Sequence, residues 1–144
     1  MDKQTIDEKQ NEIIEEFSYF DDWMDKYELL IQLGKEVPLI DDQYKKDEHL
    51  IKGCQSQVWM HAEEKNGKVF YTADSDAIIT KGLVSLVIKV LSGHKAEDIA
   101  SSKLYFIQKI GLQNHLSPTR SNGLLAMIKQ MKLYAVALQQ QKIK

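Results

Sequence analysis

The sequence has a single cysteine among its 144 residues. One cysteine cannot form a disulfide within the chain, and it excludes zinc or iron–sulfur sites built from cysteine alone, which need about four thiolates. The sequence also lacks an apolar run of membrane-spanning length, since the most apolar stretch, residues 82–91, is short and contains Lys89. The first eight residues have no apolar run typical of a signal peptide. We therefore expect a cytoplasmic protein with a free thiol and no membrane contact.

An excess of positive charge is missing as well. Lys and Arg total 19 against 21 Asp and Glu, so the net charge is -2. Nucleic acid is not expected as a partner, because binding to a phosphate backbone depends on clustered basic groups. With 43% hydrophobic and 28% charged residues, the composition is typical of a globular protein. We expect one domain over residues 1–144, with residues 1–10 as the loosely held start of an N-terminal helix.

The spacing of apolar residues predicts two helices in the first part of the chain. The first covers residues 5–17 and has a sparse apolar face. Asp21 or Asp22 is expected to cap the second, and Gly34 to end it in a left-handed conformation. The charged, irregular residues 35–48 are predicted to form a surface loop.

An alternating segment predicts a β-hairpin. Residues 54–63 alternate with a period of two, which is typical of a strand. Asn66-Gly67 supplies the two positive-φ residues of a type I′ turn, and residues 69–73 form the second strand. A third strand is expected around Leu50. The predicted fold class is therefore α+β, with a small antiparallel sheet of about three strands packed by several helices.

The rest of the chain is predicted to be helical, over residues 76–91, 95–100, 104–110 and 120–141. Gly111 is expected to end the third of these helices, and Ser117-Pro118 marks the start of the last. The first of these helices is apolar except for a narrow polar stripe, so it is expected to be the central helix of the core. Asp74 and Asp76 precede it and suit its N-terminal cap. Paired carboxylates for acid–base chemistry are the less favoured alternative for the same two residues.

Cys54 is the candidate reactive residue. Gly53 gives the backbone freedom directly before it, the polar residues Gln55 and Ser56 follow, and Lys52 would favour the thiolate, which is the reactive form of cysteine. A buried structural thiol that behaves as a small hydrophobic residue fits the position equally well. The residues alone leave both interpretations open.

No partner for a protease-like cysteine is evident in the sequence. The four histidines are scattered along the chain, at positions His49, His61, His94 and His115. They lack metal-ligand spacing, so each is expected to be a surface or packing residue. A papain-like mechanism would need one of them, with an orienting Asn or Asp, beside Cys54. Arg120 is compatible with an anion contact at a helix start or with a solvated side chain.

Three ordered segments are specific enough to compare with a known family. They are GCQSQVW at residues 53–59, DSDAIITKGL at residues 74–83 and HLSPTRSNGL at residues 115–124. Together they resemble the SufE family of sulfur acceptors, which includes the related CsdE proteins, and the similarity extends from about residue 17 to the last helix. The resemblance implies an α+β fold similar to the IscU-like cluster scaffolds, with the cysteine on a loop tip over an apolar hollow.

The resemblance implies a function for Cys54. In this family the cysteine accepts a sulfane sulfur as a persulfide from a PLP-dependent cysteine desulfurase, which here would be SufS-like or CsdA-like, and stimulates that enzyme. The sulfur then passes to an iron–sulfur scaffold of the SufBCD type. The chain would be a sulfurtransferase-type carrier and activator rather than a stand-alone enzyme, with no cofactor or metal of its own, and a monomer or weak homodimer.

Several residues near Cys54 are expected, on the same resemblance, to support its loop or to contact a partner: Gly53, Gln55, Ser56, Asp74, Asp76 and Arg120. A protein that activates the desulfurase by contact alone, with a structural Cys54, is the alternative function. An iron–sulfur scaffold is disfavoured, because U-type scaffolds offer three cysteines and this chain has one.

Overall fold

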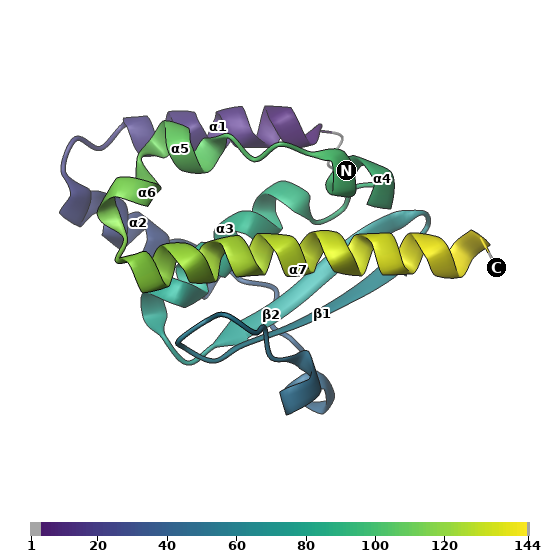
Figure 1. Cartoon of the computed structure of the whole chain (residues 1–144). Coiled ribbons are helices and arrows are strands. Elements are labelled where there is room, and N and C mark those ends of the chain that lie inside the picture. The colour runs from purple at the N-terminus through teal and green to yellow at the C-terminus, as the bar shows by residue number, and fades with distance from the viewer. Residues whose placement is uncertain (1–3, 144) are drawn as a thin grey trace.

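The computed structural model describes residues 4–143, which form seven α-helices and a two-stranded antiparallel sheet (Figure 1). The predicted α+β class is confirmed. Residues 1–3, which belong to the predicted loose start at residues 1–10, lie outside the described residues. Across residues 4–143, no helix has both the length and the apolar character needed to cross a membrane.

The first two helices begin at side-chain caps. The hydroxyl of Thr5 accepts a hydrogen bond from the Glu8 amide at 3.1 Å, and the Glu8 carboxylate accepts one from the Thr5 amide, which forms a capping box for α1 (Ile6–Ser18). Helix α2 (Trp23–Lys35) begins at Asp22, whose carboxylate accepts an amide two residues further on. The predicted start of the second helix is confirmed.

Gly34 lies inside α2, so the predicted left-handed helix end at this residue is wrong. A Cβ on Gly34 would lie 3.0 Å from the backbone nitrogen of Gly82 in α3 (Ile78–Leu91), and a Cβ on Gly82 would lie 2.3 Å from the carbonyl oxygen of Leu30. The two glycines allow α2 and α3 to pack backbone against backbone. The glycine that resembled a helix stop is therefore a packing residue.

The predicted hairpin is present. Strands β1 (Val58–Lys65) and β2 (Lys68–Ser75) pair over their whole length, from Val58 opposite Ser75 to Lys65 opposite Lys68. Asn66 and Gly67 have φ values of 55° and 81°, the positive values that the type I′ turn requires. The turn residues therefore set the register of the two strands.

The sheet has two strands rather than the three expected, because the chain before Cys54 stays extended for only a few residues. Leu50 forms a single bridge to Trp59, and on the free edge of β2 Leu39 forms a single bridge to Ala73. Two 3-10 turns precede Leu50, η1 (Asp42–Tyr44) and η2 (Asp47–His49). They occupy the segment predicted as an irregular loop.

Helix α3 is buried along most of its length, as its pattern predicted. The three polar positions of its stripe have separate roles. Ser85 is buried and donates to the Leu33 carbonyl in α2 at 2.6 Å, while Lys81 pairs with Asp74 and Lys89 lies 3.7 Å from a carboxylate oxygen of Glu36. The narrow polar stripe therefore faces α2 and the end of the hairpin.

Four helices complete the fold: α4 (Ala96–Ser101), α5 (Phe106–Ile110), α6 (Leu112–His115) and α7 (Pro118–Ile143). Gly111, at a φ of 90°, ends α5 as its position predicts, and the chain turns at once into α6, which the sequence pattern did not indicate. The long helix α7 crosses the molecule in front of the hairpin and α3 (Figure 1). Its N-terminal end lies next to Cys54.

Candidate functional site

Cys54 lies in a loop whose ends are tied together, residues 51–58, here called the Cys54 loop. The amide of Ile51 donates to the carbonyl of Val58 at 2.8 Å and closes the loop at its base. Strand β1 begins only at Val58, so the predicted strand start at residue 54 is wrong: the chain turns at Gly53, which has a φ of 97°, and is not yet paired at Cys54. The cysteine is thus held beyond the end of the hairpin.

The Cys54 loop packs on the first turns of α7 through two small residues of that helix. The Sγ atom of Cys54 lies 3.5 Å from the carbonyl oxygen of Gly123, and a Cβ on Gly123 would itself lie 3.5 Å from Sγ. On the other side of the turn, a Cβ on Gly53 would lie 3.2 Å from the Cβ of Ala126. A side chain larger than the methyl group of alanine at position 123 would take the space that the thiol occupies.

Asp76 holds the far end of the loop. Its Oδ1 atom accepts a hydrogen bond from the Gln57 amide at 3.1 Å, and its own amide donates to the Gln57 carbonyl at 3.3 Å. The predicted cap of α3 by Asp74 and Asp76 is wrong, because the residue at the cap position is Ala77 and no side chain caps that helix. Strand β2 continues through Ser75, so the Asp76 carboxylate reaches the Cys54 loop instead.

Asp74 is the centre of a small ion-pair network in β2, opposite Trp59. Its carboxylate lies 2.9 Å from the Nζ of Lys45 and 3.3 Å from the Nζ of Lys81. Partial burial acts to raise the pKa of Asp74, but hydrogen bonds from Lys45, the Ser75 amide and Lys81 together outweigh it and hold that pKa below its ordinary value. Asp74 and Asp76 thus have different partners, and the geometry does not pair them for acid–base chemistry.

A hollow of about 70 Å³ lies beside the thiol, here called the Cys54 hollow. It is lined by Cys54, Gln55, Ser56, Thr80, Ser117, Thr119, Arg120, Gly123 and Met127. Met127 is the one large apolar side chain among them, so the hollow differs from the apolar one that the family resemblance implied. A cavity needs roughly 10–15 Å³ to hold a water molecule. The Cys54 hollow therefore has room for a small group attached to Sγ.

The thiol of Cys54 is half-buried, and this burial raises its pKa. Lys52, expected to favour the thiolate, is exposed and is not one of the residues that line the hollow. In the position seen here the thiol is therefore held mainly in its protonated form. A movement that exposes the sulfur to water would remove the desolvation and favour the thiolate.

Arg120 joins the hollow from the start of α7. Its amide donates to the hydroxyl of Ser117 at 3.2 Å, so the predicted helix start at Ser117-Pro118 is confirmed. Its side chain is exposed, and among residues 4–143 its guanidinium has no ion-pair partner. The group is thus placed where it can meet an anion at the mouth of the hollow.

The structure brings together most, but not all, of the residues that the sequence singled out. Gln55, Ser56 and Arg120 line the hollow with Cys54, whereas Asp74 does not. Gly53 and Asp76 shape the loop from outside the hollow. Thr80 and Gly123 also line it, and sequence reasoning missed both, although they lie inside the segments 74–83 and 115–124 that carry the family resemblance.

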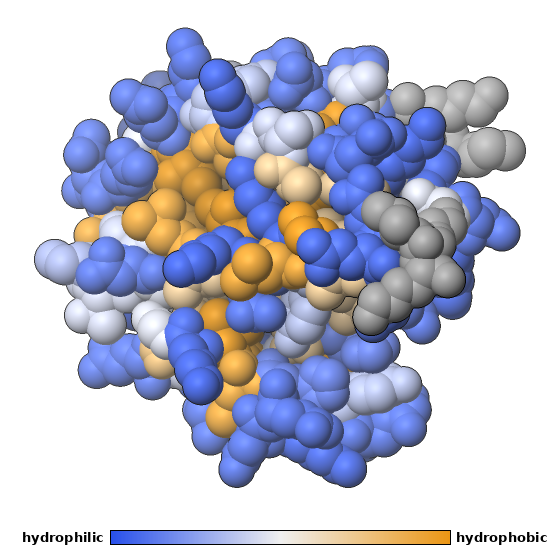
Figure 2. All heavy atoms as spheres, turned by 45° about the vertical axis from the view of Figure 1, so that its right-hand side comes forward, coloured by the Kyte–Doolittle hydropathy of each residue, from blue (hydrophilic) through white to orange (hydrophobic). Residues whose placement is uncertain are grey.

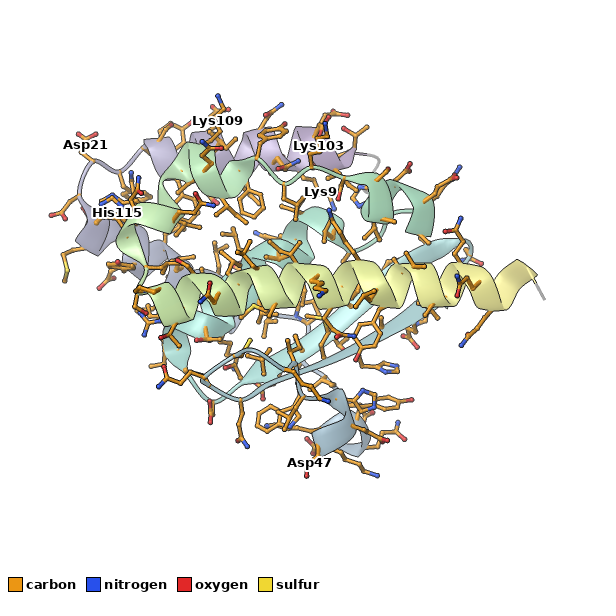
Figure 3. All side chains as sticks on the ribbon, viewed as in Figure 1. Lys9, Asp21, Asp47, Lys103, Lys109 and His115 are labelled. Carbon is orange, nitrogen blue, oxygen red and sulfur yellow. The ribbon has the colours of Figure 1, made fainter. Side chains whose placement is uncertain are left out.

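The histidines do not reach the thiol. His61 stacks on Tyr44 with ring centroids 3.8 Å apart, and His49 lies 5.6 Å from His61 on the same side of the hairpin. His115 stacks on Trp23, at the α6 end of the molecule (Figure 3). None of the histidines lines the Cys54 hollow. Within residues 4–143 no cluster of three or more His, Cys, Asp or Glu is placed to hold a metal ion.

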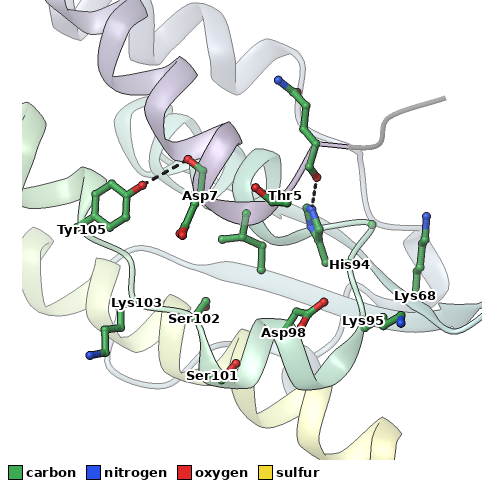
Figure 4. Close-up of a pocket in the computed structure, with 13 residues that line it drawn as sticks. Thr5, Asp7, Lys68, His94, Lys95, Asp98, Ser101, Ser102, Lys103 and Tyr105 are labelled. Carbon is green, nitrogen blue, oxygen red and sulfur yellow. Dashed lines mark hydrogen bonds between the residues drawn. The ribbon is translucent and has the colours of Figure 1, made fainter.

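A larger hollow, of about 660 Å³, lies between the start of α1 and α4 (Figure 4). His94 and Tyr105 contribute to its wall, and both already bond to backbone oxygens near the N-terminus: Nε2 of His94 lies 2.8 Å from the Gln4 carbonyl, and the Tyr105 hydroxyl donates to the Asp7 carbonyl at 3.4 Å. None of its lining residues belongs to the three segments 53–59, 74–83 and 115–124. The Cys54 hollow is therefore the candidate site.

Comparison with protein families identifies one match to most of the chain. The model of the SufE family, described as an Fe–S metabolism associated domain, matches residues 11–135. A chloroplastic and mitochondrial SufE-like protein 1 of Arabidopsis thaliana is 42% identical over 144 residues, which cover 96% of this chain and 38% of the relative. The chain thus spans less than half of that plant protein.

Bacterial relatives match over most of their own length. An uncharacterized SufE-like protein of Rhizobium etli is 39% identical over 127 residues, covering 85% of this chain and 86% of the relative. An uncharacterized SufE-like protein of Synechocystis is 38% identical, and the match covers 88% of this chain and 80% of the relative. A hypothetical protein from Thermus thermophilus, whose structure was solved in solution, has the same fold, with a TM-score of 0.77 and 20% sequence identity. The match covers 92% of this chain and 96% of the Thermus protein.

Proposed function

Because this chain belongs to the SufE family and so to iron–sulfur metabolism, we propose that Cys54 accepts sulfane sulfur as a persulfide from a PLP-dependent cysteine desulfurase. The sulfur then passes to an iron–sulfur scaffold. The observation that supports this most directly is the seat of the single cysteine, on a loop closed at its base and packed on Gly123, beside a hollow with room for one more small group.

The transfer step needs one thiol and no added oxidant or reductant. The thiolate of Cys54 attacks the terminal sulfur of the desulfurase persulfide, a new S–S bond forms at Cys54, and the old S–S bond breaks. The donor cysteine leaves as a thiolate and takes up the proton that Cys54 lost. The absence of a histidine from the Cys54 hollow is consistent with this chemistry, because the leaving group is a stable thiolate and needs no general acid.

Shielding and presentation of the thiol are opposite requirements, and the loop geometry supports a change between two positions. In the seated position burial raises the pKa of Cys54 and protects it from stray oxidants. At the surface of a desulfurase the loop swings out, the thiol loses its protein cover, and the thiolate becomes available for attack. Gly53, at a positive φ, and the Asp76 contact at Gln57 mark the two ends of the segment that moves.

The chain acts as a carrier and as an activator of a SufS-like or CsdA-like desulfurase, in the cytoplasm, and delivers sulfur to a SufBCD-like scaffold. The pyridoxal cofactor belongs to the desulfurase, and this chain has no cofactor of its own. Gln55, Ser56 and Arg120, which line the Cys54 hollow, contact the desulfurase.

A direct test is to incubate the protein with a cysteine desulfurase and free cysteine, and then to measure the intact mass without reducing agent. We expect the mass of one or more sulfur atoms to be added to wild type and removed by dithiothreitol. Cys54→Ser, the matched control, should stay unmodified. A wild-type protein that gains no sulfur while the desulfurase turns over would rule out the carrier function.

Activation by contact alone is the second candidate, and the half-buried position of the thiol against the Gly123 carbonyl is the observation in its favour. It is separated from the carrier function by measuring the rate of alanine formation from cysteine with Cys54→Ser in place of wild type. Retention of the full stimulation would support the contact-only function. If stimulation depends on accepting sulfur, the variant should return the desulfurase to its basal rate.

A further inference from the structure

Helix α7 is apolar on two sides. One stripe faces the core and is buried: Leu124, Met127, Met131 and Ala135. A second stripe faces outward, where Leu125 and Leu133 are 55% and 51% exposed. A surface helix usually has polar residues opposite its buried stripe. The outward stripe of α7 therefore calls for an explanation beyond the packing of this chain.

The outward stripe lines a shallow groove between α7 and α4, of about 360 Å³, here called the α4–α7 groove. Leu125, Ile128, Leu133 and Val136 line it from α7, and Ala100 lines it from α4. Apolar side chains gather on this side of the molecule, with charged groups around them (Figure 2). The stripe from residue 125 to residue 136 is about 16 Å long at the helical rise, or three turns.

The charges around the groove are positive. Lys129 and Lys132 line it, and no acidic residue is among the lining residues. The surrounding sequence shows the same bias: all 21 Asp and Glu lie at or before Asp98, whereas residues 99–144 contain six lysines and one arginine. A chain with a net charge of -2 thus has an apolar groove whose own charged lining residues are lysines, while Glu97 and Asp98 lie in the first turn of α4, outside the lining.

These charges select one kind of occupant. A second copy packed α7 against α7 about a twofold axis would bring Lys129 and Lys132 of the two copies together, and like charges across an interface are unfavourable. We propose instead that the α4–α7 groove binds an amphipathic helix of a partner protein that has acidic residues beside its apolar face. Such a helix places its apolar side chains in the groove and its carboxylates near Lys129, which is exposed, and near Lys132, whose Nζ also donates to the Ser102 carbonyl at 2.6 Å.

The groove lies on the side of α7 away from Cys54. With about 100° per residue, Leu125 and Lys132 lie about 160–180° around the helix axis from Gly123, on which the Cys54 loop packs. A helix bound in the groove therefore leaves the thiol open to a desulfurase. Docking in the α4–α7 groove does not depend on sulfur transfer, and the groove can be filled at the same time as the Cys54 site.

Synthetic peptides of about 14 residues test the groove. One has leucines at helical spacing flanked by glutamates, and its match has lysines in place of the glutamates. Binding of the labelled peptides to the full chain is measured by fluorescence anisotropy. We expect the acidic peptide to bind about tenfold or more tightly than the basic one. Equal binding of the two peptides would overturn the proposal.

Substitutions locate the binding and reverse its charge preference. Leu125→Ser with Leu133→Ser should weaken the acidic peptide about tenfold, whereas Met24→Ser, at an even more exposed apolar position on α2, should not change its affinity. Lys129→Glu should shift the preference toward the basic peptide. Thermal unfolding of each variant checks that it is folded. Unchanged binding after the double substitution, or a wild-type dimer in sedimentation that Leu133→Ser dissociates, would refute the partner helix.

Discussion

The Sγ atom of Cys54 lies 3.5 Å from the carbonyl oxygen of Gly123, 69 positions further along the chain. This contact joins two of the three segments that resemble the SufE family, residues 53–59 and 115–124. The thiol is seated where α7 has no side chain, so the residue at position 123 determines how far Cys54 can retreat from solvent.

A large side chain at position 123 should push the thiol out of its seat. We expect Gly123→Leu to raise the rate of Cys54 alkylation by iodoacetamide about fivefold, the effect of shifting a two-position equilibrium by about 1 kcal/mol. Gly123→Ala is the matched control, because its Cβ would meet Sγ at 3.5 Å, an ordinary contact distance. It should stabilise α7 by about 0.5–1 kcal/mol and leave the alkylation rate near that of wild type. An unchanged alkylation rate in Gly123→Leu would show that the residue at position 123 does not determine the burial of the thiol.

Loss of the Asp76 carboxylate should loosen the Cys54 loop. Asp76→Ala removes the acceptor of the Gln57 amide, so we expect about 1 kcal/mol less stability in urea unfolding, with faster alkylation of Cys54. Asp76→Asn keeps an oxygen at the same position and should restore most of both properties. Equal alkylation rates in wild type and Asp76→Ala would show that the hydrogen bond from the Gln57 amide to Asp76 does not restrain the loop.

The reactivity of Cys54 should depend on pH in a way that reports its burial. Because burial raises the pKa of the thiol, the midpoint of the alkylation rate against pH should lie higher in the folded protein than in the protein unfolded by urea. In Gly123→Leu the midpoint should move toward the unfolded value. A folded midpoint at or below the unfolded one would mean that a cation such as Arg120 dominates over burial.

The same shift of the Cys54 pKa affects stability. A thiol whose pKa is higher in the folded state favours folding below its unfolded pKa, and this contribution is lost as the pH rises through the folded pKa. Wild type should therefore lose stability in the alkaline range relative to Cys54→Ser, which has no titrating thiol. The free energy of unfolding of the two proteins in urea, measured at a pH below and at a pH above the titration of the thiol, gives this difference.

The crossing of α2 and α3 should not tolerate a methyl group at Gly82. A Cβ there would lie 2.3 Å from the carbonyl oxygen of Leu30 and 2.8 Å from its carbonyl carbon, both backbone atoms. We expect Gly82→Ala to lower the free energy of unfolding by about 3 kcal/mol, at the upper end of overpacking effects, although alanine favours helix over glycine. A loss of less than about 1 kcal/mol would show that the two helices separate easily. The measurement is urea unfolding, with Gly123→Ala as the control for a helical glycine.

Much of the local structure follows from the sequence because it depends on neighbours in the chain. Asp22 caps α2, Asn66-Gly67 makes the hairpin turn, and Gly111 ends α5, since each effect involves only a few adjacent residues. The predictions that failed concern residues whose role is set by distant segments. Gly34 is a contact for Gly82, and the Asp76 carboxylate serves Gln57 rather than the helix that follows it.

The sequence by itself determined the α+β class, the central helix, the single thiol and its resemblance to the SufE family. Only the tertiary structure decided the surroundings of that thiol: its seat on Gly123, the polar lining of the hollow that includes Thr80, and the separation of Asp74 from Asp76. The reason is physical. Periodicity and turn chemistry act over a few residues, whereas the Cys54 site is assembled from a loop, the start of α3 and the start of α7, which meet only when the core is packed.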